Sequence, residues 1–151
     1  MDEDIQREPA EILLVEDSPT DARLILDAFK QAKLGSRVTA VENGVEAMTF
    51  LRRQGKYAKA RRPDFVLLDL KLPLRSGFEV LAEIKVDADL QSIPVVVLTS
   101  SPRDVDVFKA YNLDANSYVT KPVEFEELLK AVAVIEDFWC SVVTLPPPPP
   151  L

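Results

Sequence analysis

Short apolar runs alternate with segments of helical periodicity along the chain. Three runs, residues 12–15, 65–68 and 95–98, are apolar at every position, so we expect strands that are buried on both faces. Residues 38–41 and 117–119 complete a set of five. Strict alternation of strand and helix predicts a parallel sheet with right-handed crossovers and helices on both faces. The pattern therefore predicts a doubly wound α/β fold with five strands and five helices.

Local signals indicate where the helices begin and end. Ser18 and Ser101 are each followed by a proline and then, two residues further on, by an aspartate. This spacing predicts serine N-caps with proline at the first helical position. Asn43 predicts a similar helix start. Gly35 and Gly55 follow the first two helical patterns, where a residue in the left-handed conformation is expected.

The composition limits what the protein binds and where it acts. The chain holds 18 basic and 25 acidic residues, a net charge of −7, which disfavours nucleic acid and anionic lipid as partners. No apolar stretch approaches the roughly 20 residues that a membrane span requires. Residues 1–11 lack the basic and apolar regions of a secretion signal. We therefore expect a cytoplasmic protein that binds neither nucleic acid nor membrane.

The domain organisation is expected to be simple. A length of 151 residues is typical of one domain. We expect flexible acidic residues 1–10, a folded domain over residues 11–137, and an apolar extension with a polyproline tail over residues 138–151. We expect no separate output domain after Pro122, because the 29 residues that follow it in this sequence are fewer than a domain needs.

The chain has no histidine and one cysteine, Cys140. Catalysis by Ser-His-Asp or Cys-His groups is therefore excluded, as are zinc sites built from histidine or paired cysteines. Any chemistry of this chain has to use carboxylates, hydroxyls, lysine or arginine.

Polar residues follow four of the five predicted strands. Glu16-Asp17, Asp69, Thr99 and Lys121 come after the first, third, fourth and fifth runs. Because parallel strands end at one edge of the sheet, where ligands bind in such folds, we expect these side chains to form one site. Three converging carboxylates repel one another unless a cation joins them, which indicates a hard divalent metal such as Mg²⁺. With lysine and threonine added, the group indicates phosphoryl transfer to a carboxylate.

These residues resemble the signature of the response regulator receiver domain, the CheY-like family. The resemblance spans roughly residues 11–137 and rests on Glu16-Asp17, on Asp69 followed by Pro73 and Gly77, on Thr99-Ser100, and on Tyr118 to Pro122. It implies the strand order 2-1-3-4-5 of flavodoxin-like folds. It also implies a two-component signalling protein, not an enzyme, that assists its own Mg²⁺-dependent phosphorylation and dephosphorylation.

The resemblance implies a role for each site residue. Asp69 is expected to accept a phosphoryl group from a histidine kinase. Mg²⁺ is expected to be held by Asp17, Asp69 and the backbone carbonyl of Lys71, with Glu16 acting mainly through a bound water. Lys121 is expected to contact the phosphoryl group.

A switch is implied as well. Thr99 is expected to move toward the phosphoryl group and Tyr118 to turn inward behind it, which changes the face formed by the fourth helix, fifth strand and fifth helix. Lys71 and Ser101, beside the acceptor, are expected to set the lifetime of the phosphorylated state.

Other stretches resemble a narrower group, the single-domain regulators of cyanobacterial and bacterial phytochromes. They are residues 62–64, 87–94, 122–125 and 135–139, the last ahead of further apolar residues. This resemblance implies a phytochrome-type histidine kinase as partner and a homodimer. The expected dimer residues are Phe138, Trp139, Val142 and Val143, and the alternative is that this apolar segment folds back over its own chain.

Other functions of such a fold fit less well. An FMN carrier needs a phosphate-binding loop where this chain has Glu16-Asp17, and a haloacid-dehalogenase phosphatase needs an aspartate where this chain has Lys71. The Gly-rich motif of P-loop nucleotide hydrolases is missing. An adaptor that binds partners without phosphorylation stays open, as do the kinase, its signal, a downstream phosphotransfer protein and the role of the polyproline tail.

Overall fold

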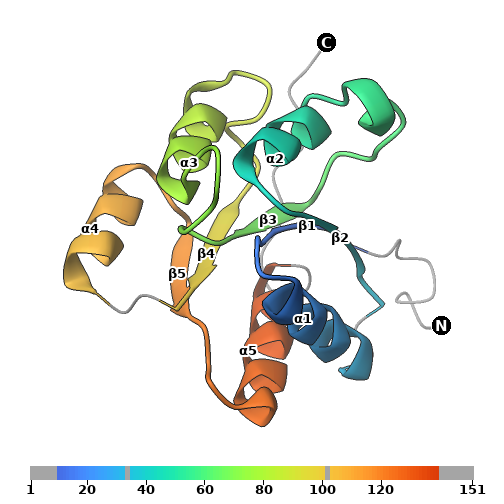
Figure 1. The fold of residues 1–151 in the computed structure, drawn as a ribbon, viewed down its shortest axis with the longest axis vertical. Helices are drawn as coiled ribbons and strands as arrows, with labels where there is room; N and C mark the ends of the chain where they lie inside the picture. The colour runs from blue at the N-terminus through green and yellow to red at the C-terminus, as the bar shows by residue number, and fades with distance from the viewer. Residues whose placement is uncertain (1–9, 33–34, 101–102, 140–151) are drawn as a thin grey trace, which may run out of the picture.

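The computed structural model describes residues 10–32, 35–100 and 103–139. Its centre is a parallel sheet with the order β2-β1-β3-β4-β5, which confirms the predicted fold class and strand order (Figure 1). The elements, in chain order, are β1 (Glu11–Val15), α1 (Pro19–Gln31), β2 (Arg37–Val41), α2 (Gly44–Leu51), the short 3-10 helix η2 (Gly55–Tyr57), β3 (Phe65–Leu68), α3 (Gly77–Val86), β4 (Val95–Thr99), α4 (Asp104–Asn112), β5 (Ser117–Thr120) and α5 (Phe125–Asp137).

The three fully apolar runs form the middle of the sheet. Every residue of β3 and β4 is buried, whereas the edge strand β2 exposes three of its five residues. Val15 lies opposite Leu68, and Leu68 lies opposite Val97, so the central strands end at nearly the same level. Residues that follow these strands are therefore placed side by side at one edge of the sheet.

Two hydrophobic layers hold the helices against the sheet. Helices α1 and α5 cover one face, while α2, α3 and α4 cover the other (Figure 1). Side chains of β1 point alternately to the two faces. Leu13 and Val15 belong to the layer under α2, α3 and α4, while Ile12 and Leu14 belong to the layer under α1 and α5. Each such fully buried aliphatic side chain stabilises the fold by about 2 kcal/mol.

Most of the predicted helix boundaries agree with the structure, and one is wrong. The side chains of Ser18 and Asn43 cap α1 and α2 as predicted, and Gly35 and Gly55 have positive φ angles of 75° and 56°. Helix α4, however, starts at Asp104 after an N-cap at Arg103, not after Ser101. The backbone of Arg103 is extended, with ψ at 131°, so this residue is not itself helical as a helix starting at Pro102 would require. Ser101 itself lies outside the described residues.

Two of the four stretches behind the narrower resemblance, residues 62–64 and 87–94, contact each other at the edge of the sheet where the strands begin. Arg62 donates hydrogen bonds to the carbonyl of Asp89 at 2.7 Å and to Oγ of Ser92 at 3.1 Å. Asp64 accepts a hydrogen bond from the backbone of Glu11 at 2.8 Å. These residues join the loops before β3 and β4 and lie far from the edge where polar side chains gather.

Most of the two terminal segments expected outside the folded domain is not described by the structure. Residues 1–9 and 140–151, which hold the acidic N-terminus and the polyproline tail, lie outside the described residues. Among the helices that the structure describes, none is long and apolar enough to cross a membrane.

Candidate functional site

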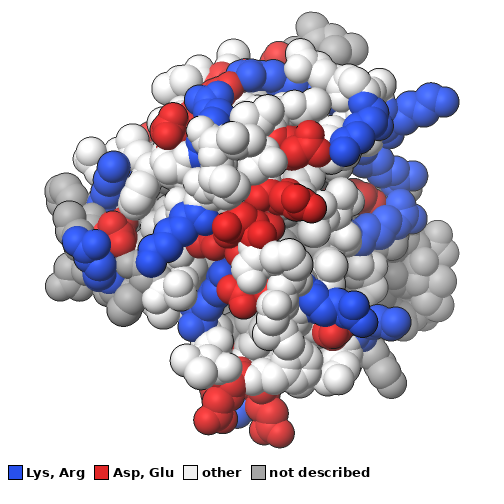
Figure 2. All heavy atoms as spheres, viewed as in Figure 1, with Lys and Arg blue, Asp and Glu red and all other residues white. Residues whose placement is uncertain are grey.

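Three carboxylates meet where β1 and β3 end. Glu16 and Asp17 follow β1, and Asp69 follows β3. One oxygen from each lies within 4.8 Å of the others. Backbone hydrogen bonds fix the spacing, because the amide of Glu16 donates to the carbonyl of Val41 at 3.0 Å and that of Asp69 donates to the carbonyl of Val15 at 3.0 Å. Figure 2 shows acidic side chains gathered near the middle of the face in view, with lysine and arginine around them.

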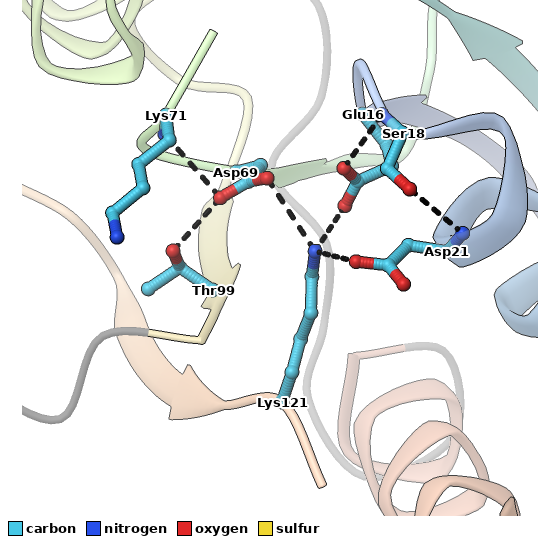
Figure 3. Close-up of polar contacts among 7 residues, drawn as sticks. All are labelled: Glu16, Ser18, Asp21, Asp69, Lys71, Thr99 and Lys121. Atoms are coloured by element: carbon cyan, nitrogen blue, oxygen red, sulfur yellow. Dashed lines mark hydrogen bonds and ion pairs between the residues drawn. The ribbon is translucent and has the colours of Figure 1, made fainter. Parts of the chain in front are cut away.

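Asp69 lies at the centre of the site and is only 6% exposed. Its Oδ1 accepts hydrogen bonds from Oγ1 of Thr99 at 2.8 Å and from the backbone amide of Lys71 at 3.3 Å. Its Oδ2 lies 3.4 Å from Nζ of Lys121 (Figure 3). Both oxygens are thus oriented by groups at the ends of β3, β4 and β5, and the carboxylate is held in one direction.

Lys121 reaches into the site from the end of β5, and its side chain is 11% exposed. Its backbone is fixed by a 2.7 Å hydrogen bond from its amide to the carbonyl of Thr99. The ammonium group contacts the carboxylates of Glu16 and Asp69, and it lies 2.9 Å from Oδ2 of Asp21 (Figure 3). One buried cation therefore offsets several negative charges.

Burial and charge shift the pKa values of the two most enclosed groups. Burial raises the pKa of Glu16 to about 7, and the hydrogen bond from Lys121 only partly opposes it. For Lys121, burial disfavours the charged form, but hydrogen bonds to Glu16 and Asp21 and the charge of Asp69 outweigh it, so that its pKa is raised. The lysine therefore stays charged at neutral pH, whereas Glu16 gains a proton easily when no further cation is present.

Gly77 allows the loop after Asp69 to fold back on the strand. Its amide donates to the carbonyl of Leu70 at 2.9 Å. A Cβ atom at this position would lie 2.2 Å from the carbonyl oxygen of Asp69 and 2.5 Å from Cα of Leu70. Only glycine fits this approach, so the loop that carries Asp69 depends on it.

The donor set suits a divalent cation. The three acidic groups offer hard oxygen ligands, two of them buried and that of Asp17 exposed to solvent. Cations such as Mg²⁺ prefer one or two carboxylates and keep several waters, which the open side at Asp17 admits. The cluster is therefore a candidate site for a divalent cation.

The other predicted site residues are placed less centrally. Lys71 contributes its backbone amide to Asp69, while its side chain is exposed. Tyr118 is partly buried and packs against the layer under α2, α3 and α4. Phe138 is 45% exposed, whereas Trp139 packs against the layer under α1 and α5. Three predicted residues, Ser101, Val142 and Val143, lie outside the described part of the chain.

The structure adds one residue that the sequence analysis did not place in the site. Asp21 was assigned only to the first turn of a helix, yet its carboxylate contacts Lys121. The two residues lie 100 positions apart. Only the strand order brings α1 beside the end of β5, and no local pattern indicates that contact.

Comparison with known proteins agrees with this geometry. Residues 12–133 match the family model described as the response regulator receiver domain. The chain is 47% identical over 138 residues to the response regulator Rcp1 of Synechocystis, covering 91% of this chain and 94% of Rcp1.

Solved structures give the same result. A structure of the phosphorylated cyanobacterial phytochrome response regulator RcpA is 47% identical and superimposes with a TM-score of 0.86, covering 92% of this chain and 99% of the other. A Mn²⁺-bound structure of Rcp1, also 47% identical, gives a TM-score of 0.84 over 92% of this chain and all, 100%, of that one. These relatives are similar to the chain in sequence as well as in fold.

Proposed function

This chain belongs to the response regulator receiver domain family, and on that premise we propose that it is a single-domain response regulator, phosphorylated on Asp69 by a histidine kinase. The observation that carries the proposal is the environment of Asp69. Its carboxylate is buried beside a lysine, a threonine hydroxyl and two further acids. An adaptor that binds without phosphorylation has no need for this arrangement.

The chemistry of this chain's residues follows from their positions. The Oδ2 atom of Asp69 attacks the phosphorus of a phosphohistidine, an O–P bond forms, and the N–P bond to the histidine breaks. Lys121 offsets the negative charge that develops on the transferred group, and the Thr99 hydroxyl is near enough to donate to one of its oxygens. Asp17, Asp69 and the Lys71 carbonyl would hold Mg²⁺, with Glu16 acting mainly through a bound water, and the cation would supply further neutralisation of phosphoryl charge.

The switch follows from the same contacts. Thr99 has to leave its bond with Asp69 to reach a phosphoryl oxygen, and Tyr118 lies on the neighbouring strand. The face of α4, β5 and α5 then responds as a two-state element. Lys71 and Ser101 set how easily water reaches the acyl phosphate and hence its lifetime. The protein acts in the cytoplasm as a phosphoacceptor.

The kinase is a phytochrome-type histidine kinase. This proposal rests on relatives whose names identify them as phytochrome response regulators and on the high identity to them, 47% for RcpA. The test is a phosphotransfer assay. A phytochrome-type kinase is autophosphorylated with radiolabelled phosphate, and the label that appears on this chain is measured. We expect rapid label on the wild type and none on Asp69→Asn. Label from an unrelated kinase but none from the phytochrome type would contradict the pairing.

A homodimer is proposed through the outer side of α5. Val134 lies on α5 and is 67% exposed, and Phe138, four residues further on, is the helical C-cap of α5 and is 45% exposed. The ring of Phe138 contacts that of Trp139 edge to face, with centroids 5.2 Å apart, and Trp139 packs on its own chain. Trp139 therefore supports the surface from within. Val142 and Val143, also expected at the interface, lie outside the described residues.

Light scattering tests the dimer. We expect a dimeric mass for the wild type and for Val86→Ser, a control on α3 where the valine is 82% exposed. Phe138→Ser is expected to shift the mass toward the monomer. A monomeric wild type at working concentration would contradict the proposal.

A further inference from the structure

Asp21 contacts the lysine of the site from outside the predicted group of residues. Its Oδ2 atom lies 2.9 Å from Nζ of Lys121, closer than the 3.4 Å between that ammonium group and Asp69. The Asp21 side chain is 42% exposed, whereas that of Glu16, which also contacts the lysine, is 1% exposed. Lys121 therefore has one partner that is not a member of the carboxylate cluster for a divalent cation.

Two helices of this chain start with the same pattern and use it differently. In α3, Oγ of Ser76 accepts from the amide of Glu79 at 3.2 Å, and the carboxylate of Glu79 accepts from the amide of Ser76 at 3.2 Å. This is a complete capping box. At the start of α3, both the serine and the acid are therefore used to cap the helix.

In α1 only half of that arrangement is present. Oγ of Ser18 accepts from the amide of Asp21 at 3.2 Å, but the amide of Ser18 donates to Oε1 of Glu16 at 3.1 Å. The carboxylate of Asp21 is thus released from the cap and points at Lys121 (Figure 3). The turn between β1 and α1 directs two carboxylates, those of Glu16 and Asp21, onto the same ammonium group.

We propose that Asp21 is a positioning residue that holds Lys121 beside Asp69 while a divalent cation occupies the site; this inference rests on the proposed function. A cation drawn to Glu16, Asp17 and Asp69 competes with Lys121 for the Glu16 carboxylate. The Lys121 side chain is only 11% exposed, so bulk water cannot replace a lost partner, and a buried charge left without enough partners is costly. Asp21 supplies a second anion, so the ammonium group stays paired and stays next to Asp69.

Loss of Asp21 is expected to change the affinity of the protein for Mg²⁺ in the absence of phosphorylation. Without Asp21, the partners of Lys121 among the described residues are Glu16 and Asp69, and both belong to the carboxylate cluster for the cation. The cation then competes harder with the lysine, so Asp21→Asn is expected to weaken Mg²⁺ binding by about two- to fivefold, the range of a partly exposed ion pair. Isothermal titration calorimetry with MgCl₂ measures this directly, and Asp21→Glu is expected to recover most of the affinity.

Two further variants separate positioning from simple loss of charge. Asp27→Asn removes the same charge from α1, where Asp27 pairs with exposed Arg23, and is expected to bind Mg²⁺ like the wild type. In a Lys121→Met background, adding Asp21→Asn is expected to have no effect, because there is no ammonium group to hold. An equal loss of affinity in both backgrounds would show a direct effect of charge on the metal and overturn the proposal.

Phosphorylation gives a second readout and keeps the two proposals apart. At saturating Mg²⁺, Asp21→Asn is expected to react with acetyl phosphate about two- to fivefold more slowly than the wild type, whereas Asp27→Asn is unchanged. If the wild type binds Mg²⁺ and is phosphorylated but Asp21→Asn behaves identically, only the role of Asp21 fails. If the wild type neither binds Mg²⁺ nor is phosphorylated, the proposed function and the role of Asp21 both fail.

Discussion

The hydroxyl of Thr99 donates a hydrogen bond of 2.8 Å to the carboxylate of Asp69, and both side chains are buried. The two residues end neighbouring strands, β4 and β3, and lie 30 positions apart in the sequence. The group expected to respond to phosphorylation is therefore already in contact with the group that would be phosphorylated. Any change at Asp69 has to alter this bond.

Replacing Thr99 by valine removes the bond but keeps the shape of the side chain. We expect the free energy of unfolding to fall by about 1–2 kcal/mol, the cost of losing one partner of a buried hydrogen bond. Asp69 keeps its bond from the Lys71 amide, so phosphorylation by acetyl phosphate continues. Phosphorylation is expected to change amide hydrogen exchange in β5 of the wild type but not of the variant.

The matched control is Thr120→Val, at the exposed register partner of Thr99. Its stability is expected to stay within about 0.5 kcal/mol of the wild type, as for most surface substitutions. The same change of β5 exchange in Thr99→Val and in the wild type would show that Thr99 does not transmit the signal.

Gly77→Ala tests how the acceptor loop is held. The added Cβ meets the backbone of Asp69 and Leu70, so we expect a loss of about 2 kcal/mol or more from overpacking and slower phosphorylation of a displaced Asp69. At Gly35 no atom lies within 4 Å of such a Cβ, and only the left-handed backbone opposes alanine. Gly35→Ala is therefore expected to cost about 1 kcal/mol and to leave phosphorylation unchanged. Urea unfolding measures the free energy of unfolding of both variants. An equal loss of stability in the two would show that the loop after Asp69 does not depend on Gly77.

The raised pKa of Glu16 predicts how stability depends on pH without metal. Burial raises that pKa from 4.5 to about 7, so between these values the folded state binds more protons than the unfolded state. The free energy of unfolding therefore falls as the pH rises through this window, by an amount on the order of 2 kcal/mol. Lys121 adds no slope there, because its pKa is raised from an already high value.

Glu16→Gln removes the titrating group and is expected to lose this part of the slope. Adding Mg²⁺ to the wild type is expected to restore stability at pH 8, since the cation stabilises the ionised carboxylates. Parallel stability curves for the wild type and Glu16→Gln from pH 4 to 8 would contradict the assignment.

Lys85 is predicted to matter for stability alone. Its ammonium group donates to the carbonyl of Ile93 at 3.0 Å and to Oδ1 of Asn116 at 2.9 Å, at the edge of the sheet where β4 and β5 begin. Lys85→Met is expected to cost about 1–2 kcal/mol, because the partly buried carbonyl of Ile93 loses this donor while Oδ1 of Asn116 keeps the backbone amide of Val95. Phosphorylation of the variant is expected to proceed at the wild-type rate. Lys130→Met, at a lysine that is 73% exposed on α5, is the control, and an equal stability for the two variants would contradict the prediction.

The sequence predicts the fold well because the fold depends on strong, repeated signals. The apolar runs of β3 and β4 contain no polar residue before their ends, and burial on both faces leaves few alternatives. The strand-end positions of Glu16, Asp69, Thr99 and Lys121 follow from that topology. The strand order came from the family resemblance and not from the pattern itself.

Two differences concern residues that carry the local pattern of a helix cap. Ser101 has the local pattern of an N-cap, yet the extended backbone at Arg103 delays α4. Asp21 has the pattern of a capping acid, yet the amide that it would cap is already bonded to Glu16. The contact of Asp21 with Lys121 cannot be read from neighbouring residues, because it joins positions that lie 100 apart in the sequence.

The measurement that tests the central claim most directly is the intact mass of the protein after incubation with acetyl phosphate and Mg²⁺. We predict the gain of one phosphoryl group by the wild type, and no gain by Asp69→Asn or by the wild type with a chelator. No adduct on the wild type, even at early times in the cold where an acyl phosphate survives, would contradict the claim, as would an equal adduct on Asp69→Asn.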